Sequence, residues 1–111
     1  MSVTFAQGFS AAGVEAGISA TPGKKDVALV VNEGPLTAAA GVFTTNRFCA
    51  APVQWSRKAV ADGSLKAVIL NSGGANACTG EAGYAQSVAT AHEVAGLLGT
   101  EDGEVAVCST G

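Results

Sequence analysis

Residues 66–80, KAVILNSGGANACTG, contain the stretch that decides the fold of this chain. Residues 66–70 form a short apolar run typical of a buried strand. A helical pattern follows at about 80–98, and a second apolar run, 105–108, comes after it. The order strand, helix, strand predicts a layered α/β sheet with a helix packed on at least one face.

The predicted helix 80–98 carries its apolar or small side chains on one stripe. Thr79 is its expected N-cap, and Glu81 suits the positive end of the helix dipole. The residues of the stripe are Tyr84, Val88, Ala91, Ala95 and Leu98. This periodicity indicates one buried and one solvated face.

The N-terminal half reads as strands linked by glycine-containing turns. Residues 5–18 suggest a bent or bulged strand or a hairpin, 26–32 a strand covered on both faces, and 38–44 a further strand. A turn is expected at 21–23 and a helix from Pro52 to about residue 62. Together these elements predict an α/β (α+β) protein with a layered mixed sheet, a single domain or domain fragment over residues 1–111.

Composition restricts the classes of function. At 111 residues and 48% hydrophobic, the chain could bury roughly two-thirds of its unfolded surface. The net charge of -3 and the lack of a basic cluster argue against nucleic acid and anionic membranes as partners. No signal peptide or membrane-length apolar run is visible. A small molecule is therefore the expected ligand.

The cysteines and the single histidine offer little chemistry at this level. Three cysteines, Cys49, Cys78 and Cys108, are an odd number without a CxxC pair, so neither a disulfide framework nor a zinc site is expected. We expect all three in core or structural positions and the protein in a reducing cytoplasm. His92 has no visible catalytic partner and is expected at the surface.

Two polar segments follow the predicted strands. The glycines of residues 71–80 permit unusual backbone angles and close approach, but the P-loop lysine and the GxGxxG pattern are missing. A tight strand-to-helix connection is the favoured interpretation. Ser109-Thr110-Gly111 follows the last strand, and from the residues alone it is a polar turn. Because a domain would normally continue from such a turn, we expect the chain to be part of a larger protein.

Three regions, in order and spacing, resemble the N-terminal part of the ornithine acetyltransferase family, the bifunctional glutamate N-acetyltransferases of arginine biosynthesis. They are FSAAGVEAGI with DVALVVNEGPLTAAAGVFTTN, then AVILNSGGANACTG, then VAVCSTG. The resemblance implies the N-terminal part of the α chain of an autoprocessed α/β fold. It also implies a precursor that cleaves itself before a threonine, which becomes the nucleophile of a ping-pong acetyl transfer.

The resemblance further assigns roles to two residues. The Thr110 hydroxyl and the Gly111 N–H match the oxyanion-hole donors of the family. No segment matches the nucleophilic threonine, so the isolated segment is expected to be inactive. The implied substrates are N-acetylornithine and glutamate, with no metal or cofactor, and acetyl-CoA is a co-substrate in some relatives. The implied partners are the remaining α chain and the β chain in an α2β2 heterotetramer.

Two other readings stay open at this level. One is a non-catalytic α/β module that binds a small anion or a nucleotide at the NSGGAN loop. The other is an assembly piece that contributes strands to a larger sheet. The sequence also leaves open whether the parent enzyme serves arginine synthesis or a specialised-metabolite pathway.

Overall fold

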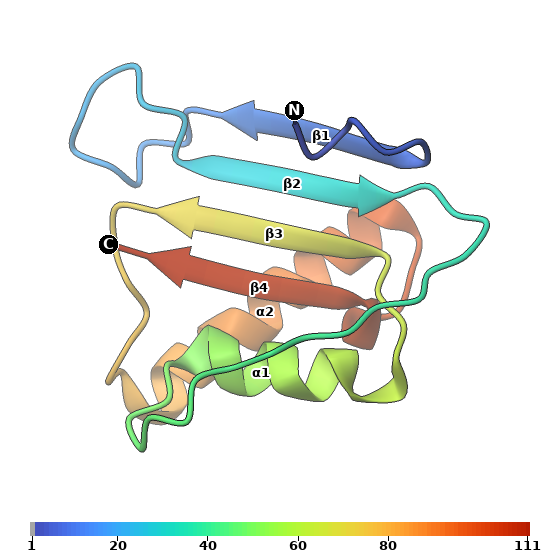
Figure 1. Cartoon of the computed structure of the whole chain (residues 1–111). Helices are drawn as coiled ribbons and strands as arrows, with labels where there is room; N and C mark the ends of the chain where they lie inside the picture. The colour runs from blue at the N-terminus through green and yellow to red at the C-terminus, as the bar shows by residue number, and fades with distance from the viewer. Residues whose placement is uncertain (1) are drawn as a thin grey trace.

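A computed structural model describes residues 2–111 as one four-stranded sheet with two α-helices (Figure 1). The strand order is β1-β2-β3-β4; β1 and β3 run antiparallel to β2, and β4 runs parallel to β3. The elements are β1 Phe9–Val14, β2 Val27–Asn32, α1 Ala51–Ala59, η1 Val60–Asp62, β3 Ala67–Ser72, α2 Gly80–Leu98, η2 Asp102–Glu104 and β4 Val105–Thr110. The predicted mixed α+β sheet is confirmed.

The unit β3-α2-β4 forms the centre of the fold. A parallel strand pair needs a crossover connection, and α2 provides it along one face of the sheet. The helix ends at Gly99, which adopts the left-handed conformation (φ 67°) and donates its N–H to Ala95 O. This arrangement brings the carboxyl ends of β3 and β4 to the same edge of the sheet.

The hydrophobic core lies between the sheet and α2. Side chains alternate between the faces of a strand, so every second residue of β2, β3 and β4 meets the helix. The buried members are Val31, Ala67, Ile69, Ala91, Val94, Ala95, Val105 and Val107. Ala91 and Ala95 confirm the stripe expected on α2.

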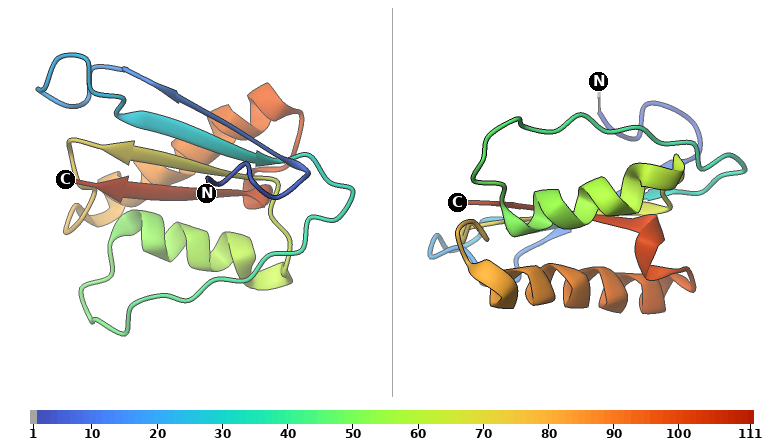
Figure 2. Two further views of the ribbon diagram at one scale, coloured as in Figure 1. Left: turned by 45° about the horizontal axis from the view of Figure 1, so that its top comes forward. Right: turned by 90° about the horizontal axis from the view of Figure 1, so that it is seen from below.

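Helix α1 lies beside β4 rather than on a sheet face (Figure 2). The Ser56 hydroxyl accepts the Val107 N–H at 2.9 Å and donates to Val107 O at 2.8 Å. The Trp55 Nε1–H donates to Val105 O at 2.9 Å. These side chains supply the hydrogen bonds that a further strand would otherwise make, so α1 covers part of the β4 edge.

The opposite face of the sheet, which Figure 1 shows in front, is covered by no helix of residues 2–111. We call this surface the open face; strand alternation places Ala28, Val30, Val68, Leu70 and Cys108 on it. The prediction that residues 26–32 are covered on both faces is wrong for the described part of the chain, because α2 reaches only one face. Most residues of β2 are half-buried.

One further prediction is wrong. Residues 38–44 form no strand; only Ala38 makes a bridge, to Ser64, and Val42 is 99% exposed. The segment passes outside α1, where no sheet edge is available to pair with it (Figures 1 and 2). Of the alternatives for residues 5–18, a bent or bulged strand or a hairpin, the structure has a single strand, β1, whose antiparallel partner is β2. No helix in residues 2–111 is long and apolar enough to cross a membrane.

Candidate functional site

The structure brings the two polar segments of the sequence together. In the β3-β4 register, Asn71 lies opposite Ser109 and Ser72 opposite Thr110. The Gly73 N–H then donates to Thr110 O at 3.1 Å. Because the strands are parallel, the loop that follows β3 covers the end of β4.

The Ser109 hydroxyl ties this loop to the strand from the α2 side. It donates to Asn71 Oδ1 at 2.7 Å, with Gly74 O a further acceptor at 3.2 Å, and it accepts the Asn76 N–H at 3.3 Å. One side chain therefore fixes the loop at several points.

Asn76 extends the network to the first turns of α2. Its Nδ2 donates to Gly83 O at 2.8 Å and to the Ser87 hydroxyl at 3.2 Å, and its Oδ1 accepts the Thr79 hydroxyl. Thr79 holds the predicted N-cap position, but its side chain serves Asn76 instead of a helix amide. A Cβ on Gly83 would overlap both Thr79 Oγ1 and Asn76 Oδ1, so this packing depends on glycine.

Gly73 meets a close backbone neighbour on its other side. It adopts a φ of 110°, and a Cβ built on it would lie 2.7 Å from the Cα and 2.8 Å from the N of Ser19. No side chain fits there. The close approach expected for the Gly73-Gly74 pair is thus confirmed at Gly73, whereas a Cβ on Gly74 would meet open space.

Asp26 holds the segment that presses on Gly73, a role that the sequence pattern did not indicate. Asp26 as a residue is 2% exposed, and its carboxylate accepts the N–H of Ala16 at 2.6 Å and of Ser19 at 2.8 Å. The Ala16 N–H, followed by the Ser19 N–H, lowers the pKa of this carboxyl, against the opposing effect of desolvation. The Asp26 carbonyl also accepts the Ser72 N–H at 2.9 Å.

Thr110 and Gly111, the predicted site residues, lie at the end of this framework. Thr110 lines a cavity of about 420 Å³ on the open face, together with Lys25, Leu70 and Cys108. Partial burial raises the pKa of the Cys108 thiol by desolvation. Within residues 2–111, neither the Thr110 hydroxyl nor the Gly111 N–H has a hydrogen-bond partner. Both donors are available to a bound group.

The hydrogen bonds of this loop also bear on the hypothesis that the NSGGAN loop binds a small anion or a nucleotide. A phosphate cradle presents free backbone N–H groups at the turn before a helix. Here the Gly73 and Asn76 amides are already bonded to Thr110 O and Ser109 Oγ. The structure thus favours the interpretation of residues 71–80 as a strand-to-helix connection that positions the end of β4.

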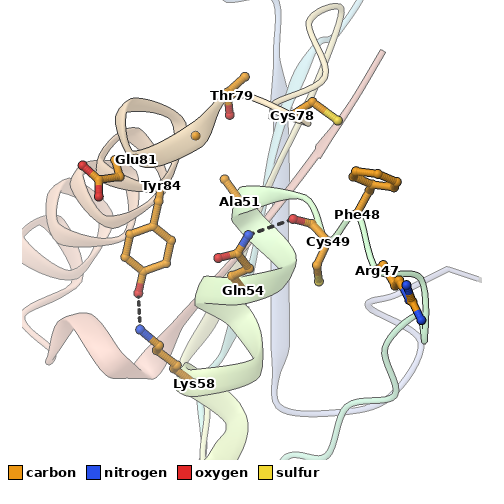
Figure 3. Close-up of a pocket in the computed structure, with 11 residues that line it drawn as sticks. Arg47, Phe48, Cys49, Ala51, Gln54, Lys58, Cys78, Thr79, Glu81 and Tyr84 are labelled. Atoms are coloured by element: carbon orange, nitrogen blue, oxygen red, sulfur yellow. Dashed lines mark hydrogen bonds between the residues drawn. The ribbon is translucent and has the colours of Figure 1, made fainter.

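A larger cleft, of about 880 Å³, lies between the N-terminal ends of α1 and α2 (Figure 3). The Lys58 Nζ donates to the Tyr84 hydroxyl at 2.8 Å across it, and Arg47, Cys49 and Cys78 contribute to its wall. Neither Thr110 nor Gly111 lines this cleft. The larger cavity and the predicted site are separate.

The cysteines differ from expectation, whereas the histidine does not. Cys78 and Cys108 are exposed and Cys49 is half-buried, so the expected core positions are wrong for Cys78 and Cys108. Cys78 lies in the loop before α2 at a φ of 57°. Strand alternation places Cys108 on the open face. His92 is at the surface, as predicted, and its Nδ1 lies 3.1 Å from the Asp102 carboxylate.

These features define an α+β protein with a mixed sheet, in which the loop after β3 clamps the end of β4. The chain belongs to the ArgJ family, whose model matches residues 10–111. It is 84% identical over its whole length to the arginine biosynthesis bifunctional protein ArgJ of Bifidobacterium longum. It is 60% identical over its whole length to the ArgJ protein of Streptomyces coelicolor.

Solved structures support the same assignment. An ornithine acetyltransferase from Mycobacterium tuberculosis, complexed with ornithine, is 60% identical and superposes with a TM-score of 0.91 over 95% of this chain and 56% of that one. An ArgJ protein from Bacillus halodurans is 39% identical, with a TM-score of 0.93 over 100% of this chain and 57% of that one. The chain spans 28% and 29% of the length of the two curated relatives.

Proposed function

We propose that this chain supplies the oxyanion hole of a glutamate N-acetyltransferase, with the Thr110 hydroxyl and the Gly111 N–H as the donors. The observation that carries the proposal is the Thr110-Gly111 peptide, which is held by the Gly73 N–H while both donors remain without a partner in residues 2–111. Two preorganised donors at one peptide can stabilise a developing oxyanion. The names of the relatives indicate the reaction, because one is an arginine biosynthesis bifunctional protein and another is an ornithine acetyltransferase.

The proposed reaction is a ping-pong acetyl transfer. The hydroxyl of a threonine, made N-terminal by self-cleavage, attacks the acetyl carbonyl of N-acetylornithine, and ornithine leaves as the free amine. The amine of glutamate then attacks the acetyl ester, which releases N-acetylglutamate and restores the hydroxyl. Each step passes through a tetrahedral oxyanion that the Thr110 hydroxyl and the Gly111 N–H would stabilise.

The remaining parts of the proposal concern the complete protein. The chain corresponds to about a quarter of its curated relatives, so the nucleophile and the groups that bind the amino-acid parts of the substrates would come from the rest of the polypeptide. We propose an N-terminal α-chain segment that works with the remaining α chain and a β chain as an α2β2 heterotetramer. No cofactor is needed, acetyl-CoA is a candidate second acetyl donor, and three free thiols suit a reducing cytoplasm.

Thr110→Ala in the complete protein tests the central assignment. Loss of one oxyanion donor should lower kcat on the order of a hundredfold to a thousandfold. The thermal unfolding temperature should stay close to wild type, because Thr110 is exposed. Thr45→Ala, at an exposed threonine outside the site, serves as the control and should leave kcat unchanged. Wild-type turnover of Thr110→Ala would refute the proposed role.

A further inference from the structure

We infer that Asp26 is a positioning residue for the proposed oxyanion hole: its carboxylate holds residues 16–19 against Gly73, and Gly73 orients the Thr110-Gly111 peptide. The inference rests on the proposed function and extends it to a residue that touches no reacting atom. Three structural steps link the Asp26 carboxylate to the Gly111 N–H.

The first step concerns the peptide that joins Thr110 to Gly111. A trans peptide is planar, with its C=O and N–H pointing in opposite directions. The Gly73 N–H holds Thr110 O at 3.1 Å, on the side of β3. The Gly111 N–H must then point away from β3, toward the edge of β4 that no strand of the described chain pairs with. A rotation of this peptide would redirect the proposed donor.

The second step concerns Gly73 itself. Its preceding residue is fixed by the bond from the Ser72 N–H to Asp26 O, at 2.9 Å. On the other side, Ser19 approaches so closely that a Cβ on Gly73 would lie 2.7 Å from its Cα. Gly73 is thus confined between Ser19 and Thr110, and its N–H has little freedom to change direction.

The third step concerns what holds Ser19 in place. Residues 15–20 belong to no helix or strand, so their position depends on side-chain hydrogen bonds. The Asp26 carboxylate accepts the Ser19 N–H at 2.8 Å and the Ala16 N–H at 2.6 Å, and the residue is buried. Hydrogen bonds from amides to a carboxylate are about twice as strong as those to a neutral acceptor. Asp26 therefore anchors the segment that confines Gly73.

Asp26→Asn in the complete protein tests the inference. Asparagine keeps the shape but replaces one acceptor oxygen with an N–H₂ group, which repels the amide it faces. Released from this anchor, residues 16–19 should withdraw from Gly73 and the donor should lose its direction. We expect kcat for acetyl transfer from N-acetylornithine to glutamate to fall about tenfold to a hundredfold, because small misplacements carry large rate losses. KM should change less than about twofold, since the donor acts in the transition state.

Ser56→Ala provides the matched control for general destabilisation. Like Asp26, Ser56 is buried and serves two backbone groups, but these belong to Val107 at the α1 side of β4. Its loss should lower the unfolding temperature and leave kcat at the wild-type value. If Asp26→Asn fails to fold, Asp26→Ser, which retains one acceptor, takes its place in the same comparison.

The outcomes separate the inference from the proposed function. A kcat for the Asp26 variant no lower than that of Ser56→Ala overturns the positioning role. If Thr110→Ala loses turnover in the same assay while the Asp26 variant does not, the oxyanion assignment stands and only the positioning role fails. Full turnover of Thr110→Ala removes the proposed function, and the inference with it.

Discussion

At the scale of single residues, Asp26 links the stability of the protein to pH. Amide donors lower its pKa in the folded state, so the folded protein binds this proton less readily than the unfolded chain does. Its contribution to stability is therefore fully present above the unfolded pKa of about 3.9 and is lost as pH falls through the lower folded value. The titration of Asp26 therefore destabilises the folded protein in acid.

We accordingly predict a pH-dependent difference between wild type and Asp26→Asn. The unfolding temperature of the variant should lie below wild type near neutral pH, and the difference should shrink below about pH 4. Thermal unfolding followed by circular dichroism from pH 3 to 7 measures both. Glu15→Gln, at an exposed carboxylate that accepts one N–H from Gly23, is the control and should show a smaller difference. An Asp26→Asn difference that is constant with pH would contradict the prediction.

The residues of the candidate site were predictable to different degrees. The Ser-Thr-Gly motif is visible in the local sequence, but the role of Thr110 and Gly111 comes from the family resemblance. The turn expected from the residues alone is wrong for Ser109 and Thr110, because both belong to β4. Asp26 begins an apolar run as a single acidic residue, and its partners, Ala16 and Ser19, lie ten and seven residues away in an irregular segment. Its role exists only once these residues are folded together, and no local pattern encodes it.

At the scale of elements, the start of α2 depends on the absence of a side chain at Gly83. We predict that Gly83→Ala destabilises the protein by roughly 1–3 kcal/mol, because the added methyl group would displace Thr79 and Asn76. Gly96→Ala on the same helix is the matched control. Its Cβ would meet open space, so this substitution should stabilise the protein by about 0.5–1 kcal/mol. Denaturant unfolding of both variants measures the difference. A stabilising Gly83→Ala would contradict the packing described here.

Some helices and strands could be predicted from the sequence because their signals are local, and others could not. β3, α2 and β4 were predicted closely, because apolar runs, a helical stripe and turn residues all lie within each segment. The strand expected at residues 38–44 failed for a non-local reason, since a strand also needs a free edge. The buried Ser56 was not foreseen, because its burial follows from the backbone groups of Val107.

At the scale of the whole molecule, two observations lead to the same prediction, that activity needs more polypeptide than residues 1–111. One is the uncovered open face, and the other is that the chain spans 28% and 29% of the length of two curated relatives. An apolar sheet face without cover is unusual for a complete monomer. We predict that residues 1–111 alone transfer no acetyl group from N-acetylornithine to glutamate, whereas the complete protein does. Product formation followed by mass spectrometry measures both, and addition of the remaining polypeptide should restore activity. Measurable transfer by the isolated segment would refute the division of the site between segments.

The helix that lies against β4 has a consequence for how this sheet can grow. With Ser56 occupying both backbone groups of Val107 and Trp55 the carbonyl of Val105, that stretch of the border cannot recruit another strand, whether from the same polypeptide or from a second molecule. A strand added along residues 105–107 is therefore excluded, which leaves the β1 side, the end of β4 after Val107, and stacking on the open face. One serine hydroxyl and one indole thus limit the directions in which a larger architecture can be built around this segment.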